Sequence, residues 1–315
     1  MRIIRFCNSL FYDKLLVSEK QGDYIMKSAY IYYILALLLF GTNGIVASCI
    51  QLTSYEIVFC RTLIGSLLLL GIFLIKKEKW TFFKFKKQFR FLTLSGVAMG
   101  LSWMFLYEAY NQIGVSIASL MYYCGPVIVM ALSPLLFKER LTASKVLGFL
   151  SVLIGIFLVN GNLVLDKQNG FGIFCGLMSA VMYSFMVIFN KKATPICGLE
   201  NSTLQLSISF LTVAIFLGFK QGYSIQITSS DIFPILFLGI VNTGIGCYLY
   251  FSKLGKLPVQ SVSVLGYLEP LSAVIFSVLI LNEKMGFVQS LGAILIIGVA
   301  IYAECSGILK KAATS

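Results

Sequence analysis

The carboxyl group of Glu269 is the first candidate for chemistry, because it lies in the middle of a long apolar run, Val259–Leu281. A charged side chain halfway across a bilayer costs about 2.5–3.5 kcal/mol on insertion scales, and intramembrane acids commonly mark solute or proton pathways. Glu269 is therefore a candidate for proton coupling or for pairing with a cationic solute. The structural alternative is a protonated carboxyl that bonds to the backbone at a helix kink.

Two prolines lie about halfway along predicted helices, Pro126 and, directly after the acid, Pro270. A proline removes one backbone donor and frees the carbonyl four residues earlier, here at Tyr122 and Gly266. Lipid cannot satisfy these carbonyls, so they should face protein or a wet cavity. The pair predicts helix breaks that line a solute site, with kinks repaired by neighbouring helices as the alternative.

Other polar and aromatic side chains fall at a similar depth when each helical residue is given a rise of about 1.5 Å. Aromatic rings can stack on planar solutes or surround an amine, although packing between helices explains any single ring equally well. The full set of solute-binding candidates is Asn43, Trp103, Tyr122, Tyr123, Tyr183, Asn242, Tyr267 and Glu269.

Arg61 and Glu108 carry opposite charges near the same end of two neighbouring apolar runs. They are candidates for an ion pair that acts as an outer gate or as a structural clamp. Alternatively, the long side chain of Arg61 reaches the lipid headgroups.

The composition excludes several classes of protein. Of the 315 residues, 58% are hydrophobic and 12% are charged, against about 25% charged in a soluble domain. An ordinary soluble enzyme and a disordered chain are both excluded. The sequence has no histidine, and its 8 cysteines form no CxxC pair, so we expect no metal and no disulfide framework. A GxxxxGK[ST] phosphate loop is also absent, and we expect no cofactor.

A membrane span needs about 20 apolar residues. The sequence predicts an all-α membrane protein with ten transmembrane helices. These are Ala29–Ile50, Ile57–Ile75, Phe91–Tyr110, Val115–Phe137, Thr142–Val159, Gly170–Asn190, Ser202–Phe219, Ile232–Phe251, Val259–Leu281 and Gly286–Leu309.

The basic residues predict the orientation. If the N-terminus is cytoplasmic, inner loops hold 21 of the 25 Lys and Arg residues and outer loops hold three, with Arg61 inside a span. Positive charge accumulates on the cytoplasmic side, so we expect both termini in the cytoplasm and the protein in the plasma (inner) membrane. The net charge of +12 is explained in this way, without a nucleic-acid partner. Residues 1–27 form a cytoplasmic segment, or the true start is Met26.

An internal repeat appears when the sequence is shifted by 144 residues. Five spans per half is an odd number, so the second half should enter the membrane upside down, as in the inverted repeats of secondary transporters. The expected repeats are residues 28–160 and 161–309, followed by a tail, 310–315. Identical pairs include Val115/Val259, Ser119/Ser263, Tyr123/Tyr267, Pro126/Pro270, Ser133/Ser277, Leu135/Leu279, Glu139/Glu283, Leu147/Leu291 and Gly148/Gly292.

The sequence resembles the EamA-type members of the drug/metabolite transporter superfamily. The resemblance rests on LFGTNG in the first span, Arg61 in the second, and the two copies CGPVIVMALSPLLFKERLTASKVLG and LEPLSAVIFSVLILNEKMGFVQSLG. It covers about residues 28–309 and implies two five-helix repeats and a small-molecule exporter or exchanger. Phe40 departs from the pattern, because many relatives carry Trp before the glycine.

These observations favour a secondary active transporter, not an enzyme, that exports a small organic metabolite by alternating access. An amino acid or amine is the expected solute, on the resemblance alone. Protons and the solute gradient both remain open as the driving force, and Glu269 favours protons. The alternatives are a broad multidrug cation exporter and, from another class, a scaffold or receptor that transports nothing. Membrane lipids are expected partners, and monomer and homodimer both remain open.

Overall fold

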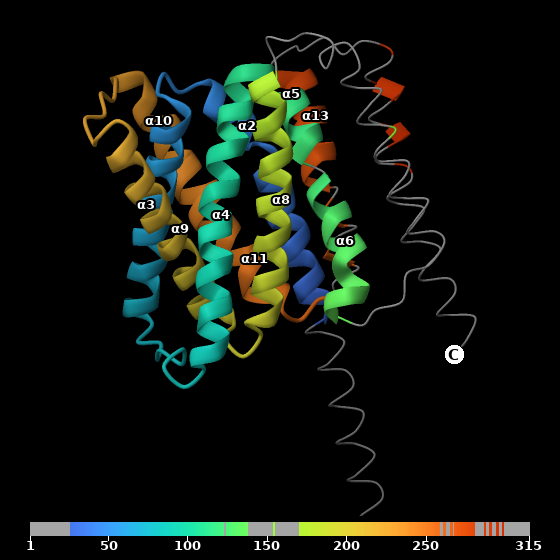
Figure 1. The fold of residues 1–315 in the computed structure, drawn as a ribbon. Helices are drawn as coiled ribbons and strands as arrows, with labels where there is room; N and C mark the ends of the chain where they lie inside the picture. Colours follow the sequence, from blue (N-terminus) through green and yellow to red (C-terminus); the bar gives the residue numbers. More distant parts are fainter. Residues whose placement is uncertain are drawn as a thin grey trace, which may run out of the picture.

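The fold is a bundle of long helices that stand side by side (Figure 1). A computed structural model describes residues 26–122, 124–137, 154, 170–258, 261–262, 265–266, 268–280 and isolated positions between 287 and 298. These residues form helices, turns and loops, with no strand among them.

Six helices in the described part are long and apolar enough to cross a membrane. They coincide within a few residues with six of the ten predicted spans. Their bounds are Met26–Ser48, Ser54–Ile75, Lys86–Ile113, Gly170–Lys192, Gly198–Lys220 and Ser229–Leu254.

Four predicted spans are described in part or hardly at all, so the number ten stays a prediction. The run Val115–Phe137 appears as α5 (Val115–Tyr122) and α6 (Cys124–Phe137), and Val259–Leu281 contains α13 (Leu268–Ile280). The runs Thr142–Val159 and Gly286–Leu309, and both terminal segments, lie almost entirely outside the described residues.

The remaining labelled elements subdivide or coincide with the six long helices. The first span ends in α2 (Asn43–Ser48). The next four are α3 (Ser54–Ile75), α4 (Lys86–Ile113), α8 (Gly170–Lys192) and α9 (Gly198–Lys220). The sixth consists of α10 (Ser229–Phe237), the π-helix η2 (Leu238–Ile245) and α11 (Gly246–Leu254).

Two of these helices begin with capping boxes, which satisfy backbone donors that a helix start leaves free. Thr53 and Glu56 exchange hydrogen bonds at the start of α3, and Thr228 and Asp231 do so at the start of α10. The other carboxyl oxygen of Asp231 accepts the backbone N–H of Gln51 at 2.9 Å. Asp231 thereby fixes the loop after α2 against the start of α10.

The π-helix η2 interrupts the sixth span at the point where its side chains meet those of α2 and α3. The hydroxyl of Thr243 donates to the carbonyl of Leu238, five residues earlier, at 2.7 Å. One extra residue per turn shifts the side chains that follow, and π-helical segments are frequent at functional sites.

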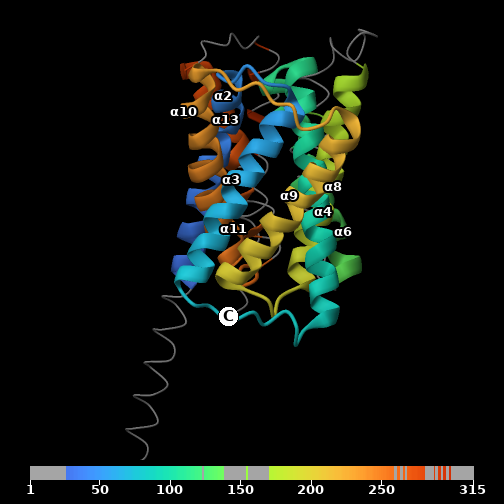
Figure 2. The same ribbon diagram turned by 90° about the vertical axis from the view of Figure 1, so that its left-hand side faces the viewer.

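Helices α3 and α9 are related by the 144-residue shift, and they run in opposite directions. The carboxyl group of Glu200, at the start of α9, accepts hydrogen bonds from Thr81 and Phe82, beyond the end of α3. Gln221 follows the end of α9, and its side-chain Nε2 lies 3.5 Å from the hydroxyl oxygen of Thr53, at the start of α3. Figure 2 shows the two helices side by side.

Glycines let the central helices approach closely. A Cβ atom on Gly96 or Gly100 of α4 would lie within 3 Å of α9, and one on Gly172 or Gly176 of α8 would collide with Ile113 or Met121. Each of these two glycine pairs is spaced four residues apart, and each therefore lets two helices of this chain pack closely against each other.

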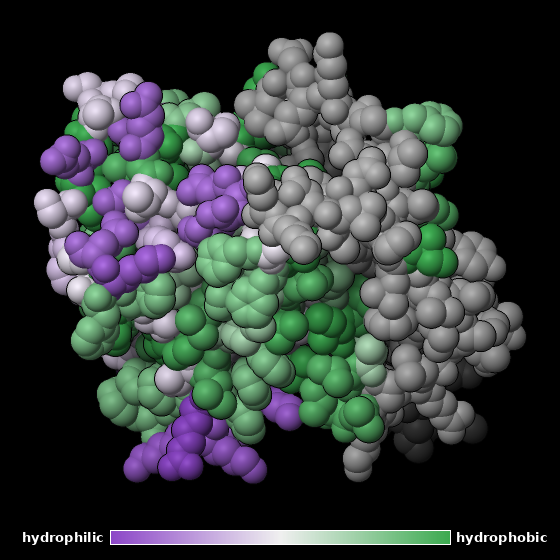
Figure 3. Space-filling view, turned by 45° about the horizontal axis from the view of Figure 1, so that its top comes forward, coloured by the Kyte–Doolittle hydropathy of each residue, from purple (hydrophilic) through white to green (hydrophobic). Residues whose placement is uncertain are grey.

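The surface of the described part has an apolar belt between two polar ends (Figure 3). Large apolar side chains such as Leu67, Leu211 and Ile215 are more than half exposed on the belt, as expected of side chains that face lipid. One end carries most of the lysines of the described part, in the loop of residues 76–87 and at Lys191 and Lys192.

Candidate functional site

A cavity lies inside the bundle, between the first span and helices α3, α4, α5, α8, α11 and α13. Its empty volume is about 410 Å³, including space open to its surroundings. The lining residues are Phe40, Asn43, Arg61, Met99, Trp103, Leu106, Tyr122, Tyr183, Met186, Tyr250, Phe251 and Glu269.

Arg61 is fully buried in α3 and faces this cavity. Its Nε donates to the hydroxyl of Thr243 at 2.8 Å, and its Nη1 donates to the hydroxyl of Tyr107. The guanidinium carbon lies 4.4 Å from the ring centroid of Trp103, a cation–π contact that stabilises the buried charge. Nη2 has no hydrogen-bond partner among the described residues, so the charge is fixed in place with one nitrogen unpaired.

Asn43 and Asn242 join α2 to the π-helix. The amide nitrogen of Asn242 donates to the side-chain oxygen of Asn43 at 3.0 Å, to Thr42 Oγ1 at 2.8 Å and to the carbonyl of Leu39 at 3.1 Å. Because its oxygen faces Asn242, Asn43 has its amide nitrogen left for the cavity. Asn242 itself lies behind the cavity wall and positions Asn43.

Aromatic rings form the opposite wall. The hydroxyls of Tyr183 and Tyr250 lie 3.3 Å apart, and the rings of Tyr122 and Tyr183 meet edge to face with centroids 5.1 Å apart. The ring of Tyr33 packs behind Tyr250, with centroids 4.9 Å apart. This wall is apolar over its ring faces and polar at its hydroxyls.

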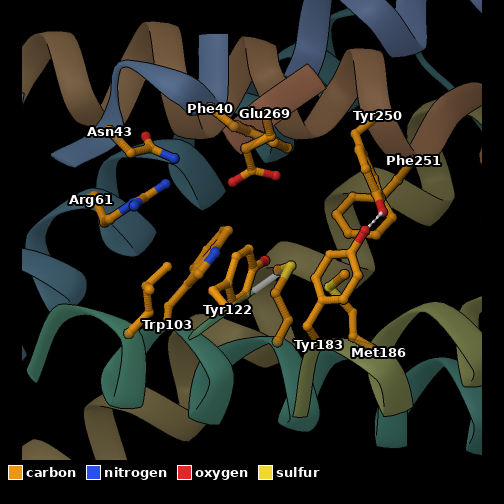
Figure 4. A pocket seen from close by; sticks show the side chains of 12 residues that line it. Phe40, Asn43, Arg61, Trp103, Tyr122, Tyr183, Met186, Tyr250, Phe251 and Glu269 are labelled. Carbon is orange, nitrogen blue, oxygen red and sulfur yellow. Dashed lines mark hydrogen bonds between the residues drawn. The ribbon is translucent and has the colours of Figure 1, made fainter. Parts of the chain in front are cut away.

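The Glu269 carboxyl points into the space between these walls (Figure 4). It lies in the first turn of α13, where the helix dipole favours negative charge. Among the residues that the structure describes, no hydrogen bond or ion pair engages this carboxyl. Arg61 and Glu269 thus line one cavity without touching.

Most of the predicted solute-binding residues meet at this cavity. Asn43, Trp103, Tyr122, Tyr183 and Glu269 line it, and Asn242 supports it. Tyr123 and Tyr267 lie outside the described residues. Pro126 is buried at the start of α6, and Pro270 lies within α13.

Arg61 and Glu108 are not brought together. The Arg61 guanidinium points into the bundle, toward Thr243 and Tyr107, whereas Glu108 accepts a hydrogen bond from Gln112, one turn further along α4. The expected ion pair is therefore wrong for this structure, and so is a reach of Arg61 to the headgroups. Both hypotheses placed Arg61 at a membrane surface, but the side chain is fully buried.

Sequence reasoning missed half of the cavity wall. Tyr250 lies next to the predicted end of its span, so depth counting excluded it, but the 144-residue shift pairs it with Leu106 on the same cavity. The remaining missed residues are apolar and give no chemical signal in a sequence with this composition. They are Phe40, Met99, Leu106, Met186 and Phe251.

A second cavity lies toward the end of the bundle that is poor in lysine. It has an empty volume of about 510 Å³. Gly44 lines this cavity while the adjacent Asn43 lines the first, and Tyr107 lines the second while its hydroxyl binds Arg61. Tyr107 and Arg61 thus stand between the two cavities.

The chain matches the model of the EamA-like transporter family twice, over residues 27–161 and 170–303. It is similar to the uncharacterized transporter YxxF of Bacillus subtilis, with 25% identity over 89% of each chain. It is also 25% identical to an uncharacterized transporter of Helicobacter pylori, over 84% of this chain and 89% of that protein.

A solved crystal structure of a protein shares the fold. The TM-score is 0.69 at 19% sequence identity, and the match covers 88% of this chain and 97% of the other.

Proposed function

The chain belongs to the EamA-like transporter family of multi-pass membrane proteins, and we propose that it is a secondary active transporter that exports a small organic metabolite. An amino acid or an amine is the solute class we favour. The observation that carries the proposal is the internal cavity, which places a carboxyl group, a guanidinium group and several aromatic rings around one space.

Alternating access is the mechanism we favour, because the geometry agrees with two inverted repeats. Arg61 of α3 contacts Thr243 at 2.8 Å. The shift of 144 residues turns this pair into Gln205 and Met99, and Gln205 Nε2 lies 3.9 Å from Met99 Sδ. The same contact thus recurs between α9 and α4. Two related halves that pack around one cavity can rock between an inward and an outward opening.

The driving force we favour is the proton gradient, with Glu269 as the coupling group. A carboxyl group that faces a cavity can hold a proton in one conformation and release it in the other. The neutral Glu269→Gln variant keeps the shape of the side chain but cannot exchange a proton. We expect it to lose the response of transport to a pH gradient while solute exchange at equal pH persists.

The test is counterflow of a metabolite panel in proteoliposomes, with and without a pH gradient. Glu78→Gln is the matched control, because Glu78 is an exposed acid in the loop after α3. Equal pH-gradient responses of Glu269→Gln and the native protein would reject proton coupling. Absence of flux for every solute would reject the transporter itself and favour a scaffold or receptor.

A broad cation exporter is the second candidate, since carboxyl groups and aromatic rings together bind organic cations. Arg61 in the same cavity disfavours it, because a fixed positive charge repels a purely cationic solute. A sensitivity screen of expressing cells against toxic cations separates the two candidates: broad resistance that depends on Glu269 would favour the second.

A further inference from the structure

We propose that Arg61 and Asn43 form a carboxylate-binding subsite, so that the transported solute is a zwitterion held between this subsite and Glu269. The inference rests on the proposed function and adds the charge pattern of the solute. It assigns Arg61 to solute recognition, where the sequence had suggested a gate.

Arg61 lines the cavity and carries one buried donor that no described residue satisfies. A buried polar group without a partner costs free energy, and the cost is larger for a charged group. Thr243 and Tyr107 occupy Nε and Nη1, and Trp103 covers one face of the guanidinium. Within the part of the chain that the structure describes, Nη2 has no partner, so an anionic acceptor from outside the protein would complete the set.

Asn43 adds a second donor on the same side of the cavity. Its oxygen accepts from Asn242 at 3.0 Å, which orients its amide nitrogen away from that residue. In the described part of the chain no acceptor meets this nitrogen. Figure 4 shows Asn43 and Arg61 together on one side of the cavity, across from Tyr183 and Tyr250. A carboxylate has two oxygens, which suits two separate N–H donors.

The fold does not require these charges. The 144-residue shift makes the neutral Gln205 the equivalent of Arg61, and Gly125 the equivalent of Glu269. Gln205 is buried like Arg61, but its amide nitrogen has a partner, Ser95 Oγ, at 2.9 Å. The equivalent positions in the other repeat therefore pack without charged residues. We assign Arg61 and Glu269 to the cavity rather than to the packing of the fold.

The separation of the two charges indicates a solute with two poles. Within the described residues, no ion pair joins Arg61 to Glu269, although both line the cavity. A guanidinium group and a carboxyl group that line one low-dielectric space without touching can bind the two opposite poles of a single molecule. The carboxylate of a zwitterion would meet Arg61 and Asn43, its ammonium would meet Glu269, and its side chain would lie on the tyrosine rings.

Triplets of related solutes test the subsite. Each triplet contains an amino acid, its decarboxylated amine and its deaminated acid, for example phenylalanine, phenethylamine and 3-phenylpropionate, and leucine with its two analogues. All proteinogenic amino acids enter the panel in this form, together with sugars and nucleosides. The readout is counterflow and competition in proteoliposomes that hold the native protein.

We expect at least one amino acid to be exchanged faster in counterflow, and to compete more strongly, than both of its analogues. The Arg61→Gln variant places the residue of the second half at this position, and it should weaken apparent affinity for that amino acid about tenfold or more, as expected for losing a charged partner. The affinity for the amine should not fall, because the variant removes a positive charge that repels it.

A second variant keeps the test valid if Arg61→Gln fails to fold. Asn43→Asp can still accept from Asn242, and its new charge should repel the carboxylates of the amino acid and the deaminated acid while sparing the amine. Lys220→Gln removes a cation far from the cavity, at the end of α9. It should leave the apparent affinities for the amino acid, the amine and the deaminated acid unchanged.

The outcomes separate the subsite from the transporter. If amines, sugars or nucleosides are transported but no amino acid is preferred, the subsite is wrong and the transporter stands. Equal losses for amino acid and amine in both variants would also overturn the subsite. If no solute of the panel moves, the proposed function and the subsite fall together.

Discussion

Two acids of this chain illustrate how hydrogen bonding separates structural from functional carboxyl groups. The Glu200 carboxyl accepts from the Thr81 N–H at 2.6 Å, the Thr81 hydroxyl at 2.6 Å and the Phe82 N–H at 2.9 Å. The Glu269 carboxyl, in contrast, meets no donor among the described residues. An acid surrounded by protein donors holds the fold, and an acid that faces an open cavity is available to a solute or a proton.

We therefore predict that Glu200→Ala destabilises the protein, by about 1–3 kcal/mol, because the backbone donors of Thr81 and Phe82 lose a charged acceptor. Thermal unfolding of the purified protein in detergent measures this loss. Glu78→Ala is the control, since Glu78 is an exposed acid in the loop that contains Thr81 and Phe82. Equal midpoints for the two variants would show that the contact with Glu200 does not stabilise the loop.

Residue identity alone predicted about half of the cavity. Polar residues deep in apolar spans stand out because burial is costly for them. This criterion selected Asn43 and Glu269, which line the cavity, and Asn242, which bonds Asn43. It failed for Arg61, whose distance from the span end suggested a membrane surface. The direction of a long side chain depends on its partners, here Thr243 and Tyr107, and those partners lie on other helices.

At the scale of helices, close packing at glycine holds the halves together. A Cβ atom on Gly100 of α4 would lie 2.9 Å from the backbone carbonyl oxygen of Ser209 in α9. Backbone cannot move aside as a side chain can, so the helices would have to separate.

Gly100→Ala should accordingly destabilise the protein, by about 1–3 kcal/mol, the usual cost of overpacking a well-packed site. Gly71→Ala is the matched control, because a Cβ atom on Gly71 of α3 meets nothing within 4 Å and alanine favours the helix. The midpoints of thermal unfolding compare the two variants. A Gly71→Ala variant as unstable as Gly100→Ala would show that helix propensity, not contact with α9, decides the result.

The long spans were predictable because lipid demands about 20 apolar residues whatever their packing. The π-helix η2 was not, although it positions both Asn242 and Thr243. Within it, the Thr243 hydroxyl donates to the Leu238 carbonyl, five residues earlier. Neither hydropathy nor residue spacing reports such a local choice.

For the whole molecule, charge distribution gives the orientation we propose. The lysine-rich loop between α3 and α4 lies at the same end as Cys197, because Glu200 in the first turn of α9 binds this loop. Cys49 lies at the opposite end, beside Gln51, which binds the start of α10. Both cysteines are exposed. Since positive loops stay in the cytoplasm, Cys49 should face outward and Cys197 inward.

A membrane-impermeant maleimide on intact cells tests this orientation. In two variants that retain only Cys49 or only Cys197, with serine at the other cysteine positions, we expect labelling of Cys49 at once and of Cys197 only after the membrane is permeabilised. Membrane vesicles of inverted orientation should reverse the order, which controls for intrinsic reactivity. Early labelling of Cys197 in intact cells would place the lysine-rich end outside. The second cavity, with Tyr107 and Arg61 at its inner limit, would then open to the cytoplasm rather than to the exterior.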